Sequence, residues 1–423
     1  MKAILLLALR SAWARRLTLG ITLIAIALSS ALLIAVERVR GDAHMSFTQS
    51  ISGVDLVVGA RTGGVQLVLY AVFHSGAATN NIRWDSFEAI SSHPSVAWAV
   101  PISLGDNHRG HPVVGTTAEY FERSRYADGR SIAFAAGRPF AGSVDRVFEA
   151  VLGSDVAREL GYRVGDRITL THGMAELGPD HADKPFTVVG VLAPSGTPVD
   201  RAAHVSLEAI TAIHLDWAGG APLPGLAIPA EQVRKFELRP KEITAVLVGL
   251  KNRSEVFRLQ RHINSYRGEP LLAVLPGVAL DELWQTLGMV ERTLFALSAL
   301  VVLVGLAGLT ATLLAGLSER RRELAILRAL GASPSALFLM LTFEGLLVTA
   351  LGICFGIVLL AAGISGLAPL AQTHFGMHLS LRPPGANELA LLASILATGL
   401  LASLVPGWRA WRMSLADGLT VRN

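Results

Sequence analysis

The sequence predicts a membrane protein with four transmembrane α-helices and a large α+β domain inserted between the first and second of them. Of its 423 residues, 51% are hydrophobic and only 17% are charged, which is less charge than the surface of a soluble protein needs. The apolar residues gather in four long runs. Residues 37–292, which separate the first run from the second, instead alternate short strand-like and helical patterns.

Each of the four runs is long enough to cross a bilayer, which takes about 20 apolar residues. The first run is longer than the apolar part of a secretory signal and no A-x-A cleavage site follows it, so we interpret it as a retained anchor. The runs cover residues 17–36, 293–317, 336–367 and 389–405. The predicted division of the chain is 1–38 (N-terminus and first span), 39–288 (inserted domain), 289–318 (second span), 319–335 (coupling loop), 336–367 (third span), 368–388 (short loop), 389–407 (fourth span) and 408–423 (tail).

The basic residues lie beside the spans and predict their orientation. Clusters precede the first span (Lys2, Arg10, Arg15, Arg16), join the second to the third (Arg320, Arg321, Arg322, Arg328) and follow the fourth (Arg409, Arg412, Arg422), whereas the loop between the third and fourth carries only Arg382. By the positive-inside rule, both termini and the coupling loop are expected in the cytoplasm and the inserted domain outside. This placement accounts for the net charge of +4, so no nucleic-acid partner is expected.

The inserted domain is predicted from runs rich in Val, Ile and Phe, which favour strands, and from short helices with N-cap residues. The strands are expected at 96–102, 112–116, 148–152, 167–171, 186–192 and 243–250, and the helices after Ser154, Ser206 and Ser254. The apolar stripe 65–73 is interpreted as a buried helix or strand, with an apolar docking surface as the alternative.

The segment after the second span has the pattern of a helix–turn–helix. The second span is expected to continue as a basic amphipathic helix through Leu330, and Gly331 to end it. Ser333 and Pro334 then suit the cap and first position of the next helix. A short helix across the membrane base could press into a groove of a soluble partner; an ordinary turn anchored by arginines is the alternative.

This segment resembles the loop between the second and third spans of the MacB/FtsX-type ABC-transporter permeases, the mechanotransmission class that includes LolC and LolE. The recurring form there is E-x-x-x-E-[IL]-[AG]-[IL]-x-[RK]-A-[LV]-G-A, followed by a helix with a glutamate. The matching residues are Glu319, Glu323, Leu324, Ala325, Ile326, Arg328, Ala329, Leu330, Gly331, Ala332 and Glu344. The stretch 406–419 resembles the family's tail through Pro406, Ala410 and Leu419, although Leu415 stands where the family has a proline.

The resemblance implies a permease that works as a dimer, with a second copy or a sister chain, in the bacterial inner membrane. It implies ABC ATPase subunits bound at the coupling loop and a substrate moved or extracted on the outer side, with a periplasmic adaptor or lipoprotein as a further possible partner. The ATPase-coupling residues would be Glu319, Arg322, Glu323, Arg328, Ala329, Leu330, Gly331, Ala332 and Glu344. An FtsX-like role, signalling to a cell-wall hydrolase without transport, is the alternative.

No G-x-x-x-x-G-K-[ST] loop or catalytic motif is present, so ATP and Mg²⁺ are expected on a separate ATPase and this chain is expected to be neither an enzyme nor cofactor-bound. Within the third span, Glu344 either supports the coupling loop or snorkels to the interface. Gly352 and Gly356 form a G-x-x-x-G pair that permits close helix packing.

Histidines raise the alternative of a metal-linked, zinc-dependent role in the cell envelope. His374 and His378 are four residues apart, the spacing that places two imidazoles on one helix face. His172 and His181 share a loop with Asp183, and His108 lies near His111. Zinc needs three or four such ligands and no single segment supplies them, so any site would require residues from distant segments.

Overall fold

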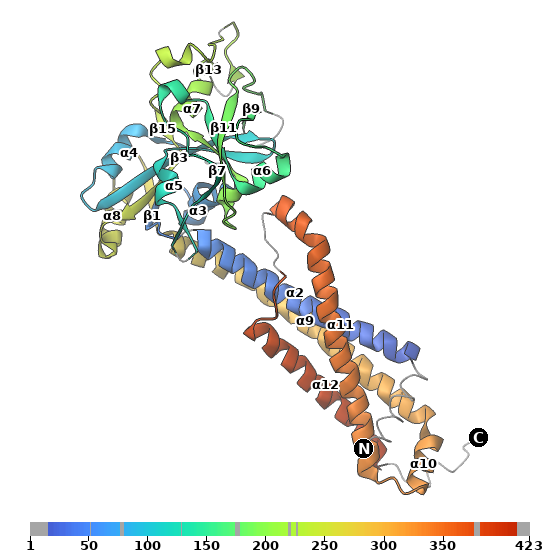
Figure 1. Ribbon diagram of the computed structural model, residues 1–423. Helices are drawn as coiled ribbons and strands as arrows, with labels where there is room; N and C mark the ends of the chain where they lie inside the picture. Colours follow the sequence, from blue (N-terminus) through green and yellow to red (C-terminus); the bar gives the residue numbers. More distant parts are fainter. Residues whose placement is uncertain are drawn as a thin grey trace. The chain divides into compact units, whose positions relative to one another are not determined.

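The four apolar runs form four long helices: α2 (Arg16–Ser50), α9 (Pro276–Glu319), α11 (Pro334–Phe375) and α12 (Ala386–Arg412) (Figure 1). The computed structural model describes residues 16–412 apart from 51, 77–79, 128, 174–177, 219–220, 226 and 376–380. Among these residues, the helices that are long and apolar enough to cross a membrane are α2, α9, α11 and α12. The predicted four spans are therefore confirmed.

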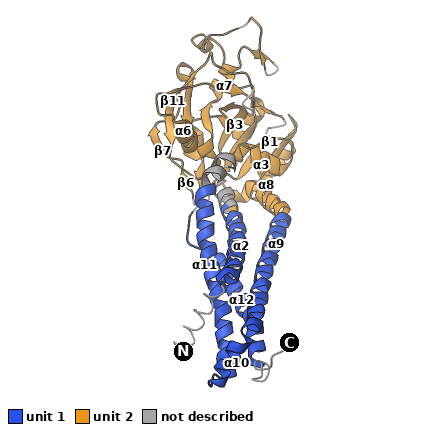
Figure 2. Cartoon of the chain, turned by 90° about the vertical axis from the view of Figure 1, so that its right-hand side faces the viewer, with its two compact units in different colours: residues 1–43, 288–423 blue, residues 44–287 orange. Residues whose placement is uncertain are grey.

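The chain divides into two units (Figure 2). The inserted domain comprises residues 44–287, and the membrane unit comprises the residues up to 43 and from 288 onward. Both α2 and α9 continue through these boundaries as uninterrupted helices. The helix α9 begins at Pro276, well before the apolar run that starts at residue 293. The residues between are too charged to be counted in a membrane span, but their composition still favours a helix.

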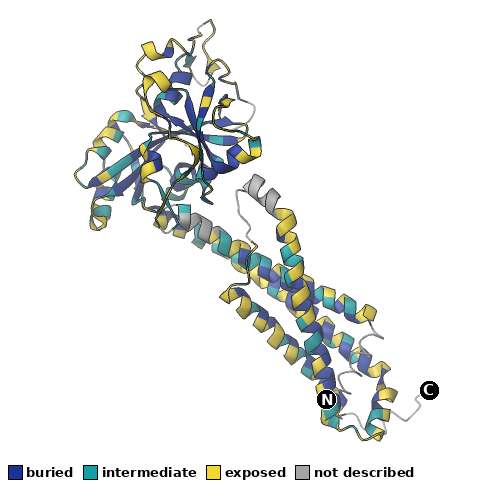
Figure 3. Cartoon of the chain, in the orientation of Figure 1, coloured by how far each residue is buried: buried dark blue, intermediate teal, exposed yellow. Residues whose placement is uncertain are grey.

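The membrane unit has a core to which all four spans contribute. Hydroxyl groups also join α2 to α9: the Thr22 and Thr312 side-chain oxygens lie 3.2 Å apart, and Ser29 donates to the Val301 carbonyl at 3.3 Å. The core residues are Leu19, Ile26, Leu33, Ile34, Val302, Leu306, Leu309, Leu313, Val348, Ile353, Leu392 and Ile395. Only 28–44% of the most apolar stretch of each span is buried within the chain, which leaves long exposed faces for lipid or another chain (Figure 3).

The glycines Gly352 and Gly356 lie where α11 approaches α2 of the same chain. A Cβ at Gly352 would lie 2.7 Å from Cγ2 of Ile26, and one at Gly356 would overlap Oγ of Ser30. The pair therefore permits close helix packing inside this chain, and that face of α11 is covered by α2. Small residues serve the contact between α11 and α12 in the same way, since a Cβ at Gly399 would lie 2.6 Å from the side chain of Thr349.

The inserted domain is built on a mixed sheet in the order β17-β1-β16-β3-β4-β12-β8-β11-β7. The 13-residue strand β3 (Val96–His108) is its centre, because its first half pairs with β16 and its second half with β4 and the short β10. The other strands of this sheet are β1 (Leu56–Ala60), β4 (His111–Thr116), β7 (Phe134–Gly137), β8 (Glu149–Leu152), β9 (Arg167–Ile168), β10 (Thr171–His172), β11 (Phe186–Leu192), β12 (Ala203–Ser206), β16 (Ala245–Leu250) and β17 (Leu271–Val274). The pairs β4–β12 and β8–β11 are parallel and the rest antiparallel, which confirms the α+β class.

Three two-stranded ladders lie outside the main sheet: β2 (Ile82–Arg83) with β15 (Glu242–Ile243), β5 (Arg125–Tyr126) with β6 (Arg130–Ser131), and β13 (Trp217–Ala218) with β14 (Ala221–Pro222). The sequence patterns at 148–152 and 186–192 correspond to β8 and β11. The run 167–171 is divided between β9 and β10, and 243–250 between β15 and β16. The second break lies at Thr244, whose hydroxyl accepts a hydrogen bond from the Leu104 amide at 3.0 Å.

In the described part of the inserted domain, six helices pack around the sheets: α3 (Gly64–Phe73), α4 (Trp84–Ser91), α5 (Glu119–Arg123), α6 (Ser154–Leu160), α7 (Leu207–Ile213) and α8 (Val256–Asn264). Short 3-10 turns cover Val144–Arg146, Pro198–Arg201, Val233–Lys235 and Arg253–Glu255. The apolar stripe 65–73 lies in α3 and has Leu67, Val68, Tyr70 and Ala71 buried, so it belongs to the core and the docking-surface interpretation is wrong.

The helix caps agree with the sequence in one case and differ in two. Ser206 caps α7 as predicted, because its hydroxyl accepts from the Ala209 amide at 3.1 Å. For α6 the cap is Gly153, not Ser154, since a Cβ at 153 would overlap the backbone of Asp200 and only glycine fits. Before α8, Asn252 rather than Ser254 provides the capping oxygen.

Candidate functional site

The segment that the sequence singled out contains a short, separate helix, α10 (Arg321–Ala329), between α9 and α11. The expected uninterrupted helix through Leu330 is wrong, because the chain bends at Arg320, whose φ and ψ are −99° and 12°. The Arg320 side chain is nearly buried, with Nη1 3.7 Å from Oε2 of Glu344 in α11. The bend places the Arg320 guanidinium beside the Glu344 carboxylate and separates α10 from α9.

The far end of α10 follows the predicted turn. Gly331 has φ +101°, which glycine adopts without the strain a Cβ brings, and its amide donates to the Arg328 carbonyl at 3.0 Å. The Ser333 hydroxyl accepts from the Ala336 amide at 3.2 Å, and Pro334 is the first residue of α11. Ala332 completes the turn, because its amide donates to the Leu327 carbonyl at 3.0 Å.

One side of α10 is anchored. Leu324 and Ala325 are buried, and Leu324 belongs to a small apolar cluster with residues at the end of α9, the start of α11 and the end of α12. The members of this cluster from those helices are Leu317, Leu337, Met340, Leu341 and Ala410. The helix is therefore held at both its bend and its base.

The other side of α10 is exposed. Arg322, Ile326, Ala329 and Leu330 follow the spacing i, i+4, i+7 and i+8, which places them on one helix face, here called the α10 face. Ile326 is 49% exposed and Leu330 is 80% exposed. Two large apolar side chains beside an arginine on a fixed helix are typical of a protein docking surface.

The remaining predicted coupling residues surround this face. Glu344 is 2% exposed and paired with Arg320, so the interpretation that it snorkels is wrong. Glu319 is exposed at the end of α9, and Arg328 is half-buried in the last turn of α10. Glu323 is exposed, with Oε2 3.9 Å from Nε of Arg320. The sequence analysis interpreted Arg320 only as a charge that sets the orientation of the spans. The one signal for its pairing with Glu344 was the helix–turn–helix pattern between the two residues, because such a turn brings the two helices together.

A second ion pair lies at the opposite end of the membrane unit and was not predicted. Nε and Nη2 of Arg38 in α2 donate to the two carboxylate oxygens of Glu388 in α12, at 3.2 and 2.7 Å. Arg382 extends the group, with Nη2 3.6 Å from Glu388 and 3.1 Å from Asp42. Both members of the central pair are buried.

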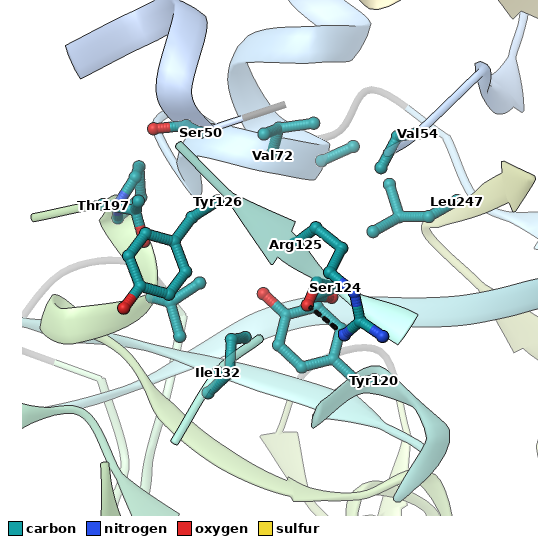
Figure 4. A pocket seen from close by; sticks show the side chains of 13 residues that line it. Ser50, Val54, Val72, Tyr120, Ser124, Arg125, Tyr126, Ile132, Thr197 and Leu247 are labelled. Atoms are coloured by element: carbon teal, nitrogen blue, oxygen red, sulfur yellow. Dashed lines mark hydrogen bonds between the residues drawn. The ribbon is translucent and has the colours of Figure 1, made fainter. Parts of the chain in front are cut away.

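A small pocket lies in the inserted domain, between α3, α5, the β5–β6 ladder and the turn at Thr197 (Figure 4). Tyr120, Tyr126, Ile132 and Leu247 supply much of its wall, and Arg125 is the charged residue among the described residues that line it. Nη1 of Arg125 donates to the carbonyl oxygens of Glu122 and Ser124. The pocket presents no set of acid, base and nucleophile.

The predicted metal candidates have different surroundings. His172 and His181 come together with two residues that sequence reasoning missed, Asp106 and His214. Asp183 does not join them and pairs with Lys184 at 2.7 Å. His108 and His111 lie apart from this group: Nδ1 of His108 is 2.6 Å from the Thr169 carbonyl, and Nε2 of His111 is 3.6 Å from Glu159. His378 lies outside the described residues, as does the side chain of His374.

Comparisons with known proteins identify the family. Residues 17–264 match the profile of the MacB-like periplasmic core domain, and residues 295–415 match the FtsX-like permease C-terminal domain. The chain belongs to the MacB/FtsX family of ABC-transporter permeases. Permeases of this family are located in the inner membrane and work with an ATPase and with a second permease chain.

Individual relatives are distant. The lipoprotein-releasing system transmembrane protein LolC of Xylella fastidiosa (strain Temecula1) is 20% identical, over 90% of this chain and 95% of its own. The macrolide export ATP-binding/permease protein MacB of Azoarcus sp. (strain BH72) is 26% identical, over 54% of this chain and 32% of its own. A crystal structure of the periplasmic region of MacB from Actinobacillus actinomycetemcomitans is 13% identical, covers 57% of this chain and 97% of that one, and has a TM-score of 0.32.

Proposed function

We propose that this permease relays ATP hydrolysis by a separate ATPase subunit to its inserted domain, which moves or extracts a substrate on the outer side of the inner membrane. In this proposal the chain binds no nucleotide, and ATP and Mg²⁺ stay on the ATPase. Both termini and α10 are cytoplasmic, as the basic clusters favour. The second permease chain is a copy or a sister of this one, and a periplasmic adaptor or lipoprotein receives or presents the substrate.

The observation that carries the proposal is the α10 face. A partner that pushes on a flexible loop moves only the loop, whereas α10 is packed on three spans and joined to α11 through Arg320 and Glu344. Displacement of Ile326 or Leu330 must therefore disturb this cluster. The exposed apolar area gives a partner binding energy, and Arg322 gives it a charge to recognise.

The connection to the inserted domain is covalent. The helix α9 ends beside α10 and begins, without interruption, at Pro276 inside the inserted domain. The helix α2 likewise continues from the membrane unit to Ser50. Two helices shared by both units can transmit a tilt or rotation more directly than flexible linkers.

The test is co-purification of the permease with its ATPase. Leu330→Glu and Ile326→Glu place a carboxylate on the α10 face without disturbing its buried side, and we expect at least a tenfold loss of bound ATPase with unchanged membrane insertion. Leu17→Glu is the matched control, because it replaces an equally exposed leucine outside the coupling loop, in the first turn of α2, where the helix dipole tolerates the charge. Equal recovery of ATPase with all three variants would place the contact elsewhere.

A further inference from the structure

Four potential metal ligands from four segments converge in the inserted domain. They are Asp106 in β3, His172 in β10, His181 in the following loop and His214 at the end of α7, and their ligand atoms all lie within 4.8 Å of one another. Three imidazoles and one carboxylate are a donor set that suits Zn²⁺ and neighbouring divalent transition metals. We propose that Asp106, His172, His181 and His214 form a binding site for one such ion, with Zn²⁺ as the best fit. This proposal goes beyond the coupling function and does not depend on it.

The fold positions the two strand residues directly. Asp106 and His172 are opposite each other in the β3–β10 ladder. The pairing of β3 with β4 is irregular between Leu104 and Asn107, and such a bulge redirects a side chain from the regular alternation of a strand. The Asn107 side chain holds the end of β10, since its Nδ2 donates to the Gly173 carbonyl at 2.6 Å.

The distances converge on the buried carboxylate. Oδ1 of Asp106 is 3.0 Å from Nδ1 of His172, 3.6 Å from Nε2 of His214 and 4.0 Å from Nε2 of His181. Ligands around a tetrahedral ion with bonds of about 2.0–2.1 Å are separated by roughly 3.3–3.4 Å. These pairs lie on either side of that value and the whole set lies within 4.8 Å, so side-chain shifts of about an ångström bring the four groups into a zinc coordination sphere.

His214 is oriented as a metal-bound histidine usually is. Its Nδ1 lies 2.8 Å from the Ile210 carbonyl, which can only accept, so Nδ1 carries the proton and the Nε2 lone pair is directed at the cluster. A backbone carbonyl that fixes the tautomer in this way is one of the usual outer-shell partners of a histidine ligand.

His181 is the residue that a purely structural network does not explain. It is fully buried, and among the described residues neither ring nitrogen has a hydrogen-bond partner. Without a metal, an ion pair between Asp106 and His172, with His214 as a further acceptor, would satisfy the other three groups. The His181 imidazole would then bear the cost of an unmade hydrogen bond, about 1–3 kcal/mol. A metal ion bound to Nε2 gives that nitrogen a partner, while Nδ1 keeps none among the described residues.

The nearest buried cation is already neutralised. Lys184 is fully buried and its Nζ contacts Asp216 at 2.9 Å as well as Asp183, so the lysine charge is balanced by two carboxylates. Asp106 therefore remains as the anionic ligand of the cluster. Trp217 adds a natural reporter, because its ring centroid lies 4.2 Å from that of His181.

The test uses the full-length protein in detergent, stripped with a chelator and titrated with Zn²⁺ or with spectroscopically visible Co²⁺. We expect one ion per chain by elemental analysis, the absorption of tetrahedral Co²⁺, and quenching of the fluorescence that Trp217→Phe removes. Asp106→Asn and His214→Gln should each weaken affinity at least ~100-fold, since even outer-shell partners contribute about 10–100-fold. Both variants keep the size of the side chain, and His214 is partly exposed, so folding should survive.

The matched control is His262→Asn, which removes an exposed histidine outside the cluster and should retain one ion with unchanged affinity. Failure to bind a stoichiometric ion would overturn the proposal. So would equal affinity in the wild type, Asp106→Asn and His214→Gln, which would show adventitious surface binding only. Neither result depends on whether the ATPase docks at α10.

Discussion

The two ends of the membrane unit are each joined by a buried arginine–glutamate pair, yet the two pairs differ in geometry. Arg38 and Glu388 make two parallel hydrogen bonds, supported by Arg382. Nη1 of Arg320 lies 3.7 Å from Oε2 of Glu344, which is beyond hydrogen-bond distance. The first pair fixes α2 to α12. The second leaves the bend beside α10 able to rearrange, and that is the end where we propose that the ATPase acts.

The difference indicates that the two ends of the helix bundle have different mechanical properties. A bidentate buried pair has one optimal arrangement and resists displacement. A looser pair at a helix bend can exchange partners, and Glu323, 3.9 Å from Arg320, offers such an alternative. Rigidity at one end and adjustability at the other is what a relay of motion requires.

The largest expected effect is the loss of one partner at the rigid end. Glu388→Gln leaves the buried charge of Arg38 uncompensated and should lower the stability of the membrane unit by about 3–5 kcal/mol. Arg38→Met should cost less, because Arg382 still contacts Glu388. The measurement is thermal unfolding in detergent. The double variant Arg38→Met with Glu388→Leu should recover most of the loss. A small effect of the single variants would remove the contrast between the two ends.

Glu344→Gln should cost less, about 1–3 kcal/mol, because the pair is looser and Glu323 is within reach of Arg320. We expect the variant to bind the ATPase normally but to couple poorly, so that ATP hydrolysis by the complex responds less to the permease. The comparison of bound ATPase with its turnover checks this. Normal turnover would limit Glu344 to a structural role.

Between the two ends, Gly356→Ala should destabilise the contact of α11 with α2 by about 1–3 kcal/mol, because the new methyl overlaps Ser30 and the Ala27 carbonyl. Gly363→Ala is the control in the same helix. No atom lies within 4 Å of a Cβ there, so the gain in helix propensity should make the change neutral or slightly stabilising. Unfolding midpoints of the two variants measure the difference.

The last effect is a pH dependence confined to the inserted domain, which sharpens the comparison because the ion pairs of the membrane unit are not involved. Burial lowers the pKa of His74 to about 4 and that of His204 to about 3. Both rings are neutral when folded and titrate near 6.5 when unfolded, so the stability they confer is complete above about pH 6.5 and is lost as the pH falls toward 4 and then 3.

Each histidine contributes a slope of up to about 1.4 kcal/mol per pH unit in that window. His204→Phe fills a similar volume beside Tyr120 and Phe121 and should remove one such contribution, flattening the dependence between pH 7.5 and 5. Urea unfolding of the inserted domain, followed at both pH values, provides the measurement. An unchanged slope would assign the acid sensitivity to other groups.

The sequence predicted what depends on local pattern: four spans, the turn at Gly331 and Ser333, the cap at Ser206 and the strands β8 and β11. It did not predict what depends on distant partners. The bend at Arg320 brings its side chain to Glu344 in another helix, and the Arg38–Glu388 pair joins residues 350 positions apart. In the histidine cluster, His172 and His181 stood out by residue type, whereas Asp106 and His214 became recognisable only once β3, β10 and α7 were placed together.

The most direct test of the coupling account is the labelling of Leu330→Cys by a membrane-impermeant maleimide, in a Cys354→Ala background. We predict no labelling in intact spheroplasts, full labelling in inside-out vesicles, and protection there when the ATPase is bound. Phe257→Cys, exposed in the inserted domain, should show the opposite sidedness. Labelling of Leu330→Cys from outside the cell, or no protection by the ATPase, would contradict the account.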